Sequence, residues 1–222
     1  MLSVLAPGPM VTVQDAGRFG LGRAGVSAAG PMDPGLMRLA NALTGNDPGA
    51  AALEFAGFGG GFRAETDLVI ALAGDAPLTI GDRPAPAFTA HRIPAGTGFR
   101  IGALSGATWG YLAVAGGIAT PPVMGSRATH LRFSLGRALA AGDRLPVGAA
   151  EPRRLMLDRP PRPETGPLRV VLGPQADRFP PATLDRFLSA AFTVTAERDR
   201  MGMVLDGPPL TAGPMRHQVI HI

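Results

Sequence analysis

A glycine-rich segment near the N-terminus, residues 12–23 (TVQDAGRFGLGR), gathers four polar side chains that could do chemistry: Gln14, Asp15, Arg18 and Arg23. An arginine offers planar, forked hydrogen-bond donors that suit a carboxylate, a phosphate or a carbonyl oxygen. A glutamine or an aspartate beside it can orient the arginine or bind an amide substrate. The alternative is a structural loop closed by an Asp15–Arg18 ion pair. Because loops on a rigid scaffold often carry function, both interpretations stay open.

Two later segments carry a similar mixture of side chains. Residues 125–130 (GSRATH) place Ser126, Arg127 and Thr129 close together, which fits either an anion-binding loop or an ordinary solvated one. Ser126 lacks the Gly-x-Ser-x-Gly frame of a hydrolase nucleophile, and the sequence assigns it no acid–base partner. Asp199 and Arg200 resemble the first loop, although a turn with a local ion pair is the simpler interpretation.

Three further polar residues lie in or next to an apolar pattern. Asp33 precedes Pro34 and an apolar stripe, so helix capping explains it best. Asn41 falls opposite that stripe, where it either caps a turn or points to solvent. Glu54 lies in the apolar stretch 50–58, where a carboxylate needs a partner and an arginine is expected. Glu54 is therefore either half of a buried structural pair or an acid of the site.

The composition excludes several kinds of chemistry. All 21 basic residues are arginine, so the chain offers no lysine for a Schiff base, a phosphate-binding loop or attachment of biotin. The absence of cysteine excludes disulfides, a thiol nucleophile and cysteine-type zinc sites. The four histidines show no metal-ligand spacing, so no metal site is predicted. Residues 20–25 (GLGRAG) match the three-glycine dinucleotide pattern, but no helix begins there, and a glycine-rich turn is favoured.

Charge and hydropathy set further bounds. The net charge is +4 and the arginines are scattered, so no basic stripe indicates nucleic acid. No apolar run approaches 18 residues, which argues against a membrane span, and no targeting segment is visible. The sequence therefore predicts a cytoplasmic protein.

Glycine and proline punctuation predicts a mainly β fold with a few short helices. Gly and Pro total 31 and 23 residues and recur every 8–12 positions along much of the chain, a pattern typical of sandwiches and barrels. A helix is expected between the Asp33 cap and a left-handed Gly45. The glycines of 57–62 (GFGGGF) predict a bend at a strand end. Strands are expected at 2–5, 10–14, 68–73, 78–80, 99–104, 108–115 and 144–147.

A change of character at residues 149–167 divides the chain. This segment is rich in proline and charge and predicts an extended linker between one domain at 1–148 and a second unit at 168–222. In the second unit we expect a strand at 168–172, a helix at 182–191, a strand at 192–195 and a loop at 197–202. The final residues, 217–222 (HQVIHI), resemble the middle of a strand. A faint echo between the two units suggests an internal duplication.

Several of these motifs, taken in order, resemble a known family. The opening signature comprises residues 12–25, 30–33, 40–41, 45–46 and 53–54. Residues 111–118 (YLAVAGGI), 124–129 (MGSRAT), 173–179 (GPQADRF) and 199–202 (DRMG) match later signatures. Together they look like the allophanate hydrolase subunit 2 or biotin-dependent carboxyltransferase-like family. This family includes the C subunit of bacterial ATP-dependent 5-oxoprolinase, the antagonist of the sporulation kinase inhibitor, and part of urea carboxylase.

The resemblance implies a fold and an activity. The fold would be a cyclophilin-like β-barrel followed by part of a second similar barrel, as in a family member shortened at its C-terminus. The activity would be that of the C subunit of 5-oxoprolinase, which helps ATP-driven opening of 5-oxo-L-proline to L-glutamate by phosphorylating the lactam and then hydrolysing it. The implied partners are the A subunit of 5-oxoprolinase and a B subunit of the allophanate hydrolase subunit 1 type. One alternative is biotin-dependent carboxyl transfer to urea or a similar amide, with biotin on a separate carrier; another is a non-catalytic module that binds a kinase-inhibitor-type subunit.

The resemblance also suggests roles for the candidate residues. Arg18, Arg127 and Arg200 would hold a developing oxyanion or a phosphoryl group. Gln14 and Asp15 would orient the amide, and Asp33 and Glu54 would serve as polar anchors or proton carriers. The remaining candidates for contact with substrate or an anion are Arg23, Asn41, Ser126, Thr129 and Asp199.

Overall fold

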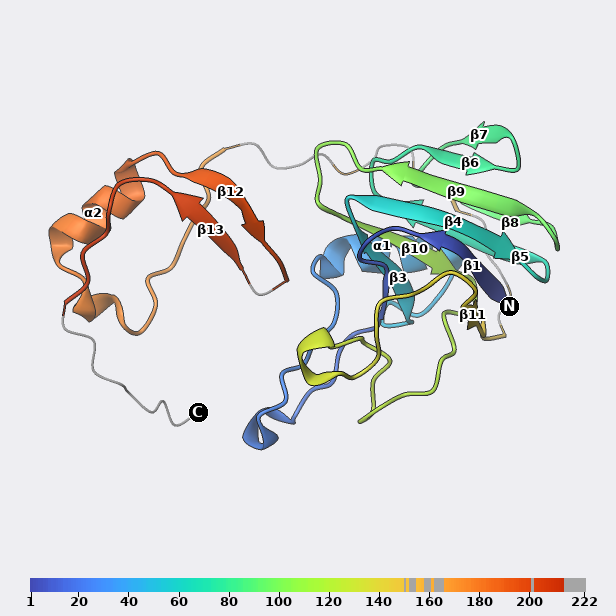
Figure 1. Cartoon of the computed structure of the whole chain (residues 1–222), viewed down its shortest axis with the longest axis horizontal. Coiled ribbons are helices and arrows are strands. Elements are labelled where there is room, and N and C mark those ends of the chain that lie inside the picture. The colour runs from blue at the N-terminus through green and yellow to red at the C-terminus, as the bar shows by residue number, and fades with distance from the viewer. Residues whose placement is uncertain (150, 152–154, 158–160, 162–165, 201, 214–222) are drawn as a thin grey trace. The chain divides into compact units, whose positions relative to one another are not determined.

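The computed structural model describes residues 1–149, 151, 155–157, 161, 166–200 and 202–213. The chain divides into two compact units, Met1–Pro161 and Arg162–Ile222, which we call unit 1 and unit 2 (Figure 1). Much of the predicted linker at 149–167 and the predicted strand at 217–222 lie outside the described residues. The predicted domain boundaries at 148 and 168 remain predictions.

Unit 1 contains two antiparallel sheets. Sheet 1 has six strands in the order β11-β1-β4-β9-β6-β7, and sheet 2 has five in the order β2-β3-β10-β5-β8. The strands of sheet 1 are β11 (Arg144–Leu145), β1 (Leu2–Pro7), β4 (Phe58–Ala64), β9 (Gly98–Ala103), β6 (Leu78–Ile80) and β7 (Arg83–Ala85). Those of sheet 2 are β2 (Thr12–Gln14), β3 (Ala52–Ala56), β10 (Trp109–Val114), β5 (Leu68–Ala73) and β8 (Ala90–Ile93).

The main core of unit 1 is built from side chains of both sheets. Leu2 and Val4 of β1 and Phe62 of β4 join Leu53 of β3 and Leu112 of β10 in one buried cluster. Successive strand residues point to opposite faces of a sheet. The alternate residues of sheet 2, such as Tyr111 and Ala113, therefore lie on its other face, in a second cluster with residues of helix α1.

Helix α1 (Pro34–Thr44) covers that other face of sheet 2 (Figure 1). The Asp33 side chain accepts a hydrogen bond from the Leu36 amide at 2.8 Å, and Pro34 occupies the first turn, as predicted. Gly45 ends the helix with a φ of 77°, a left-handed conformation that costs glycine little. Both ends of this helix were therefore readable from the sequence.

Gly57 forms the predicted bend at a strand end, between β3 and β4, with a φ of 69°. Gly59, Gly60 and Gly61 lie inside β4, which the sequence did not predict. A side chain at Gly59 would collide with Ile101 of the neighbouring strand β9. Gly60 has a φ of 100° and approaches the backbone of β1, where the strand register shifts between Val4 and Ala6. These glycines therefore allow close approach within a bulged sheet.

Residues 155–157 form hydrogen bonds with earlier parts of unit 1. The Leu155 amide bonds the Leu43 carbonyl, and the Ala90 amide bonds the Leu155 carbonyl. The Leu157 amide bonds the Phe88 carbonyl, and its side chain packs against the clusters beneath α1. This piece of the predicted linker therefore extends the surface of unit 1.

Unit 2 contains η3 (Ala176–Arg178), α2 (Pro181–Ser189), and a hairpin of β12 (Thr193–Arg198) and β13 (Met203–Asp206). The predicted strand at 168–172 is wrong, because no strand lies there. Leu168 is 89% exposed and Val171 is 96% exposed, and within the described residues this apolar run has no strand beside it to form a ladder. The predicted loop at 197–202 begins later, since β12 continues to Arg198.

The mainly β fold with few helices is confirmed. Most predicted strands are present, with the ends of several displaced by a few residues, whereas β3, β4, β7, β8 and β13 were not predicted. Across the part of the chain that the structure describes, none of the helices combines the length and the apolar character that a membrane span needs.

Candidate functional site

Two loops far apart in the sequence meet at the end of β2. The first, residues 15–30, folds back on itself through a hydrogen bond from the Arg18 amide to the Ala28 carbonyl at 2.7 Å. The second, residues 120–136, is tied to β2 by the Thr129 amide, which bonds the Val13 carbonyl at 2.9 Å. This arrangement brings together six of the predicted site residues: Gln14, Asp15, Arg18, Ser126, Arg127 and Thr129.

Asp15 holds the two loops together. Its carboxylate accepts hydrogen bonds from the Ser126 hydroxyl and the Arg127 amide, both at 2.5 Å, and from the Gly17 amide at 2.9 Å. The Ser126 oxygen in turn accepts the Ala128 amide at 3.0 Å. The structural alternative of an Asp15–Arg18 pair is therefore wrong, because Asp15 orders the 126–128 segment instead.

Arg18 is buried with much of its hydrogen-bonding capacity unused. The residue is only 3% exposed, and Nη2 donates to the Ala128 carbonyl at 2.5 Å. Nε and Nη1 are buried and have no hydrogen-bond partner. A buried cation is costly unless it is paired. Two free donors on such a cation therefore indicate a place for a ligand oxygen.

Gln14 carries a complementary free acceptor. Its Nε2 donates to the Thr129 carbonyl at 3.2 Å and to the Thr12 hydroxyl oxygen at 3.0 Å. Because a carbonyl can only accept, the amide nitrogen must face Thr129, which leaves Oε1 on the other side. Oε1 is buried without a partner. Gln14 and Arg18 thus bind carbonyls of one short segment and leave one acceptor and two donors free.

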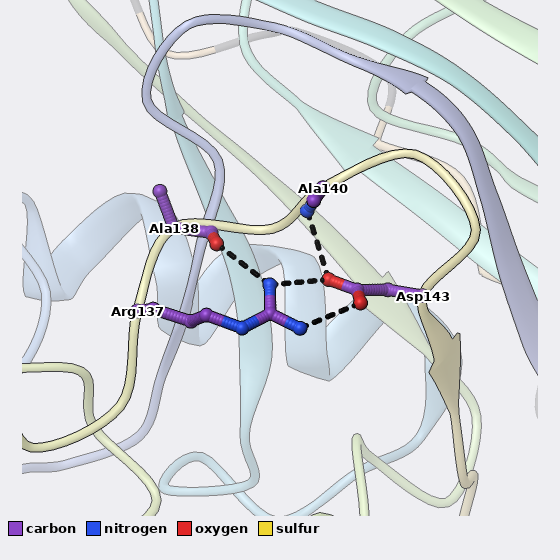
Figure 2. A network of polar contacts seen from close by, with 4 residues as sticks. All are labelled: Arg137, Ala138, Ala140 and Asp143. Carbon is purple, nitrogen blue, oxygen red and sulfur yellow. Dashed lines mark hydrogen bonds and ion pairs between the residues drawn. The ribbon is translucent and has the colours of Figure 1, made fainter.

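A pocket of about 260 Å³ lies beside Arg18. Its wall includes Ser126, Arg127 and Thr129 of the second loop. Arg137 and Asp143 form another part of the wall, joined by two hydrogen bonds of 2.8 and 2.7 Å (Figure 2). The Arg137 guanidinium holds the pKa of the Asp143 carboxyl below its usual value, chiefly through this hydrogen bonding.

A second polar group lies under the start of α1. Glu54 Oε2 accepts the Tyr111 hydroxyl at 2.7 Å and the Met32 amide at 2.8 Å. The Tyr111 oxygen accepts the Asp33 amide at 2.7 Å. Burial raises the pKa of Tyr111. These two contacts of Glu54 are with neutral donors and anchor the N-terminus of the helix. The arginine partner suggested by the sequence remains a prediction.

Strand pairing links the two groups across sheet 2. Thr12 lies opposite Glu54, and Glu54 lies opposite Tyr111. Directly paired residues of antiparallel strands share a face, and Gln14 lies on the same face two residues after Thr12. A polar row therefore runs beneath α1 from Gln14 to Tyr111.

The remaining predicted site residues lie apart from these groups. Asn41 is fully buried, so solvent exposure was the wrong alternative; its amide donates to the Pro48 and Ala50 carbonyls and so holds a turn. Arg23 is exposed on the short helix η1 (Gly22–Ala24). In unit 2, Asp199 accepts the Gly202 amide in the turn after β12, and desolvation lowers the pKa of the half-buried Arg200.

Sequence reasoning missed two pairings. Tyr111 was noted only as part of a strand and of a family signature, and its contact with Glu54 depends on a register that no local motif encodes. The exposed Ser27 hydroxyl lies 2.6 Å from Nε2 of the buried His130, a contact between the same two loops. No spacing rule relates residues 103 positions apart.

The arrangement can bind a polar planar group. Donors on Arg18 suit an oxygen that gains negative charge, and the Gln14 acceptor suits an N–H group. Among the residues that the structure describes, no cluster of three or more His, Cys, Asp or Glu side chains could hold a metal ion.

Comparison with known proteins places these features in context. Residues 24–221 match the family described as the carboxyltransferase domain, subdomain A and B. The chain is 35% identical over 229 residues to the C subunit of 5-oxoprolinase from Escherichia coli, in a match that covers 100% of this chain and 73% of that protein.

Solved structures agree with this match. The crystal structure of TTHA0988 superposes with a TM-score of 0.87 and 37% identity, covering 97% of this chain and 81% of that one. The Kluyveromyces lactis urea carboxylase superposes with a TM-score of 0.84 and 30% identity, covering 96% of this chain but 21% of that one. These neighbours share the mainly β fold described above.

Proposed function

We propose that this chain, which belongs to the family of the carboxyltransferase domain, subdomain A and B, is the C subunit of a cytoplasmic ATP-dependent 5-oxoprolinase. In that complex it would help to open 5-oxo-L-proline to L-glutamate. The γ-phosphoryl group of ATP passes to the lactam oxygen and ADP leaves. One water then breaks the ring C–N bond, and a second water hydrolyses the resulting acyl phosphate and releases phosphate.

One observation carries this proposal: Arg18, with two free donors, and Gln14, with a free acceptor, bind the carbonyls of the adjacent residues Ala128 and Thr129. A lactam presents a carbonyl oxygen and an N–H group on the same edge of its ring. Arg18 would bind the oxygen and stabilise the negative charge that it gains, and Gln14 would accept the N–H. A polar ligand is recognised best where the buried groups of its site would otherwise stay unpaired.

The other residues would position this pair. Asp15 fixes the 126–128 segment that holds Arg18, so it would act through Arg18. Glu54 and Asp33 anchor the start of α1, and Arg127 lines the pocket. The A and B subunits would complete the complex and bring ATP to it.

The test is an assay of 5-oxoproline-dependent ADP release by the chain co-expressed with its A and B partner subunits. We expect Arg18→Met and Gln14→Leu each to lower kcat/KM at least about tenfold. A loss of this size is typical when a hydrogen bond to a charged group, or to a group that gains charge, is removed. Arg63→Met, on the exposed side of β4, is the matched control. A complete complex without ADP release, which instead carboxylates urea from a biotinylated carrier, would refute the proposal.

Carboxyl transfer to urea is the second candidate, and the similarity to urea carboxylase favours it. Urea also presents an oxygen and an N–H on one edge, and the biotin would have to arrive on another protein because this chain has no lysine. A purely regulatory module would bind a partner of the B-subunit type without turnover of either substrate.

A further inference from the structure

The pocket beside Arg18 has an unusual balance of charge. Four arginines and one carboxylate line it: Arg18, Arg127, Arg137, Arg144 and Asp143. The carboxylate is already used, since Asp143 binds Arg137 through both oxygens and also accepts the Ala140 amide at 2.8 Å (Figure 2). Among the described residues, no carboxylate forms a salt bridge with the other three arginines.

The positive charge is held in place by the fold. Arg18 is fixed by Ala128, and Arg127 is fixed at both ends, by the bond from its amide to Asp15 and by the bond from Nε to the Thr120 carbonyl at 2.7 Å. The Arg137–Asp143 pair forms a further part of the wall. Preorganised donors lose little freedom when a ligand arrives, so such a wall suits anion binding.

The size of the pocket restricts the ligand. About 260 Å³ is less than the space that a typical drug-sized ligand occupies. A carboxylate or a phosphoryl group fits this space, and arginine forks suit both.

We infer that this pocket is a binding site for a compact oxyanion, with Arg18 and Arg127 as its ligands. The inference deepens the proposed function and rests on it for the natural occupant, which would be either the carboxylate of 5-oxoproline or the transferred phosphoryl group. Arg18 would then serve two neighbours, with one free donor directed to the lactam and the other to the anion.

The test is isothermal titration calorimetry of inorganic phosphate into the full chain at low ionic strength. Arg18→Met and Arg127→Met are expected to weaken binding about tenfold or more, whereas Arg63→Met should bind like the wild type. Circular dichroism in the near ultraviolet checks that each variant is folded. If Arg18→Met fails to fold, Arg127→Met decides alone.

Competition identifies the source of the oxyanion. If 5-oxoproline displaces phosphate but 2-pyrrolidinone, the same ring without a carboxylate, does not, the site takes the substrate carboxylate. If 5-oxoproline and phosphate bind together, the site takes the phosphoryl group. Absence of phosphate binding, or equal binding by Arg18→Met, Arg127→Met and the wild type, overturns the inference. Binding needs no partner protein, so a complex without ADP release would refute the proposed function while leaving this result intact.

Discussion

Replacing Arg18 by methionine should make the free protein more stable, although most substitutions of buried residues destabilise. The substitution keeps an unbranched apolar stem and removes a buried cation that has two unpartnered donors. The lost hydrogen bond to Ala128 costs about 1.5–3 kcal/mol. The variant no longer has to bury an uncompensated ion on folding, which saves a desolvation penalty of several kcal/mol. The difference favours the variant by about 1–3 kcal/mol.

Thermal unfolding can measure this difference in unit 1 alone. The only tryptophan and the only tyrosine of the chain, Trp109 and Tyr111, both lie in β10. Their near-ultraviolet signal should give a Tm for the Arg18→Met variant about 3–10 °C above that of the wild type. Phosphate at a hundred times the wild-type Kd should add about 2.7 kcal/mol to the wild type and at most about 1.4 kcal/mol to the variant, whose Kd is at least about tenfold higher. A lower Tm for the variant than for the wild type would refute the view that the buried, partly unpaired Arg18 destabilises the free protein. An equal gain in stability from phosphate in both proteins would refute the view that Arg18 binds the anion.

Three further outcomes test the packing around the site. Tyr111→Phe removes a donor from the buried Glu54 carboxylate and should cost about 2–3 kcal/mol, measured as a shift of the urea midpoint with an unchanged slope; an unchanged midpoint would show that Glu54 is otherwise satisfied. Asp15→Asn keeps only one carbonyl acceptor for three donors, so hydrogen exchange at residues 126–128 should accelerate about tenfold, and unchanged exchange would contradict its role. The Arg137–Asp143 pair lowers the pKa of Asp143, so its contribution to stability is present above the ordinary aspartate pKa and is lost as the pH falls through the lowered value. The Tm difference between wild type and Arg137→Met should therefore vanish at strongly acid pH, and a difference that persists there would exclude the ion pair as its cause.

Local sequence signals predicted the elements whose ends are encoded in the chain itself. The Asp33 cap, Pro34 and Gly45 place helix α1 correctly because capping depends on a few adjacent residues. The glycines of β4 were misread because their reason lies in another strand: Gly59 leaves room for Ile101, and no nearby residue reveals that neighbour.

The candidate site was half predictable for the same reason. Polar residue types marked Gln14, Asp15 and Arg18, and the later loop with Ser126, as places where chemistry could occur. The partners could not be assigned, since proximity suggested Asp15–Arg18 whereas the fold joins Asp15 to Ser126, 111 positions away. Tyr111 entered the site only through the register of β10 against β3.

The long sequence separation within the loop pair also bears on how the protein is made. Arg18 bonds a carbonyl 110 residues further along the chain. At about 5–20 residues per second, a ribosome needs roughly 6–22 s to synthesise that interval. Arg18 therefore lacks this partner during that time, and unit 1 cannot form the hydrogen bond until the chain has reached Ala128. Closure of the two loops is thus a late event in biogenesis, and the pocket beside Arg18 forms only after it.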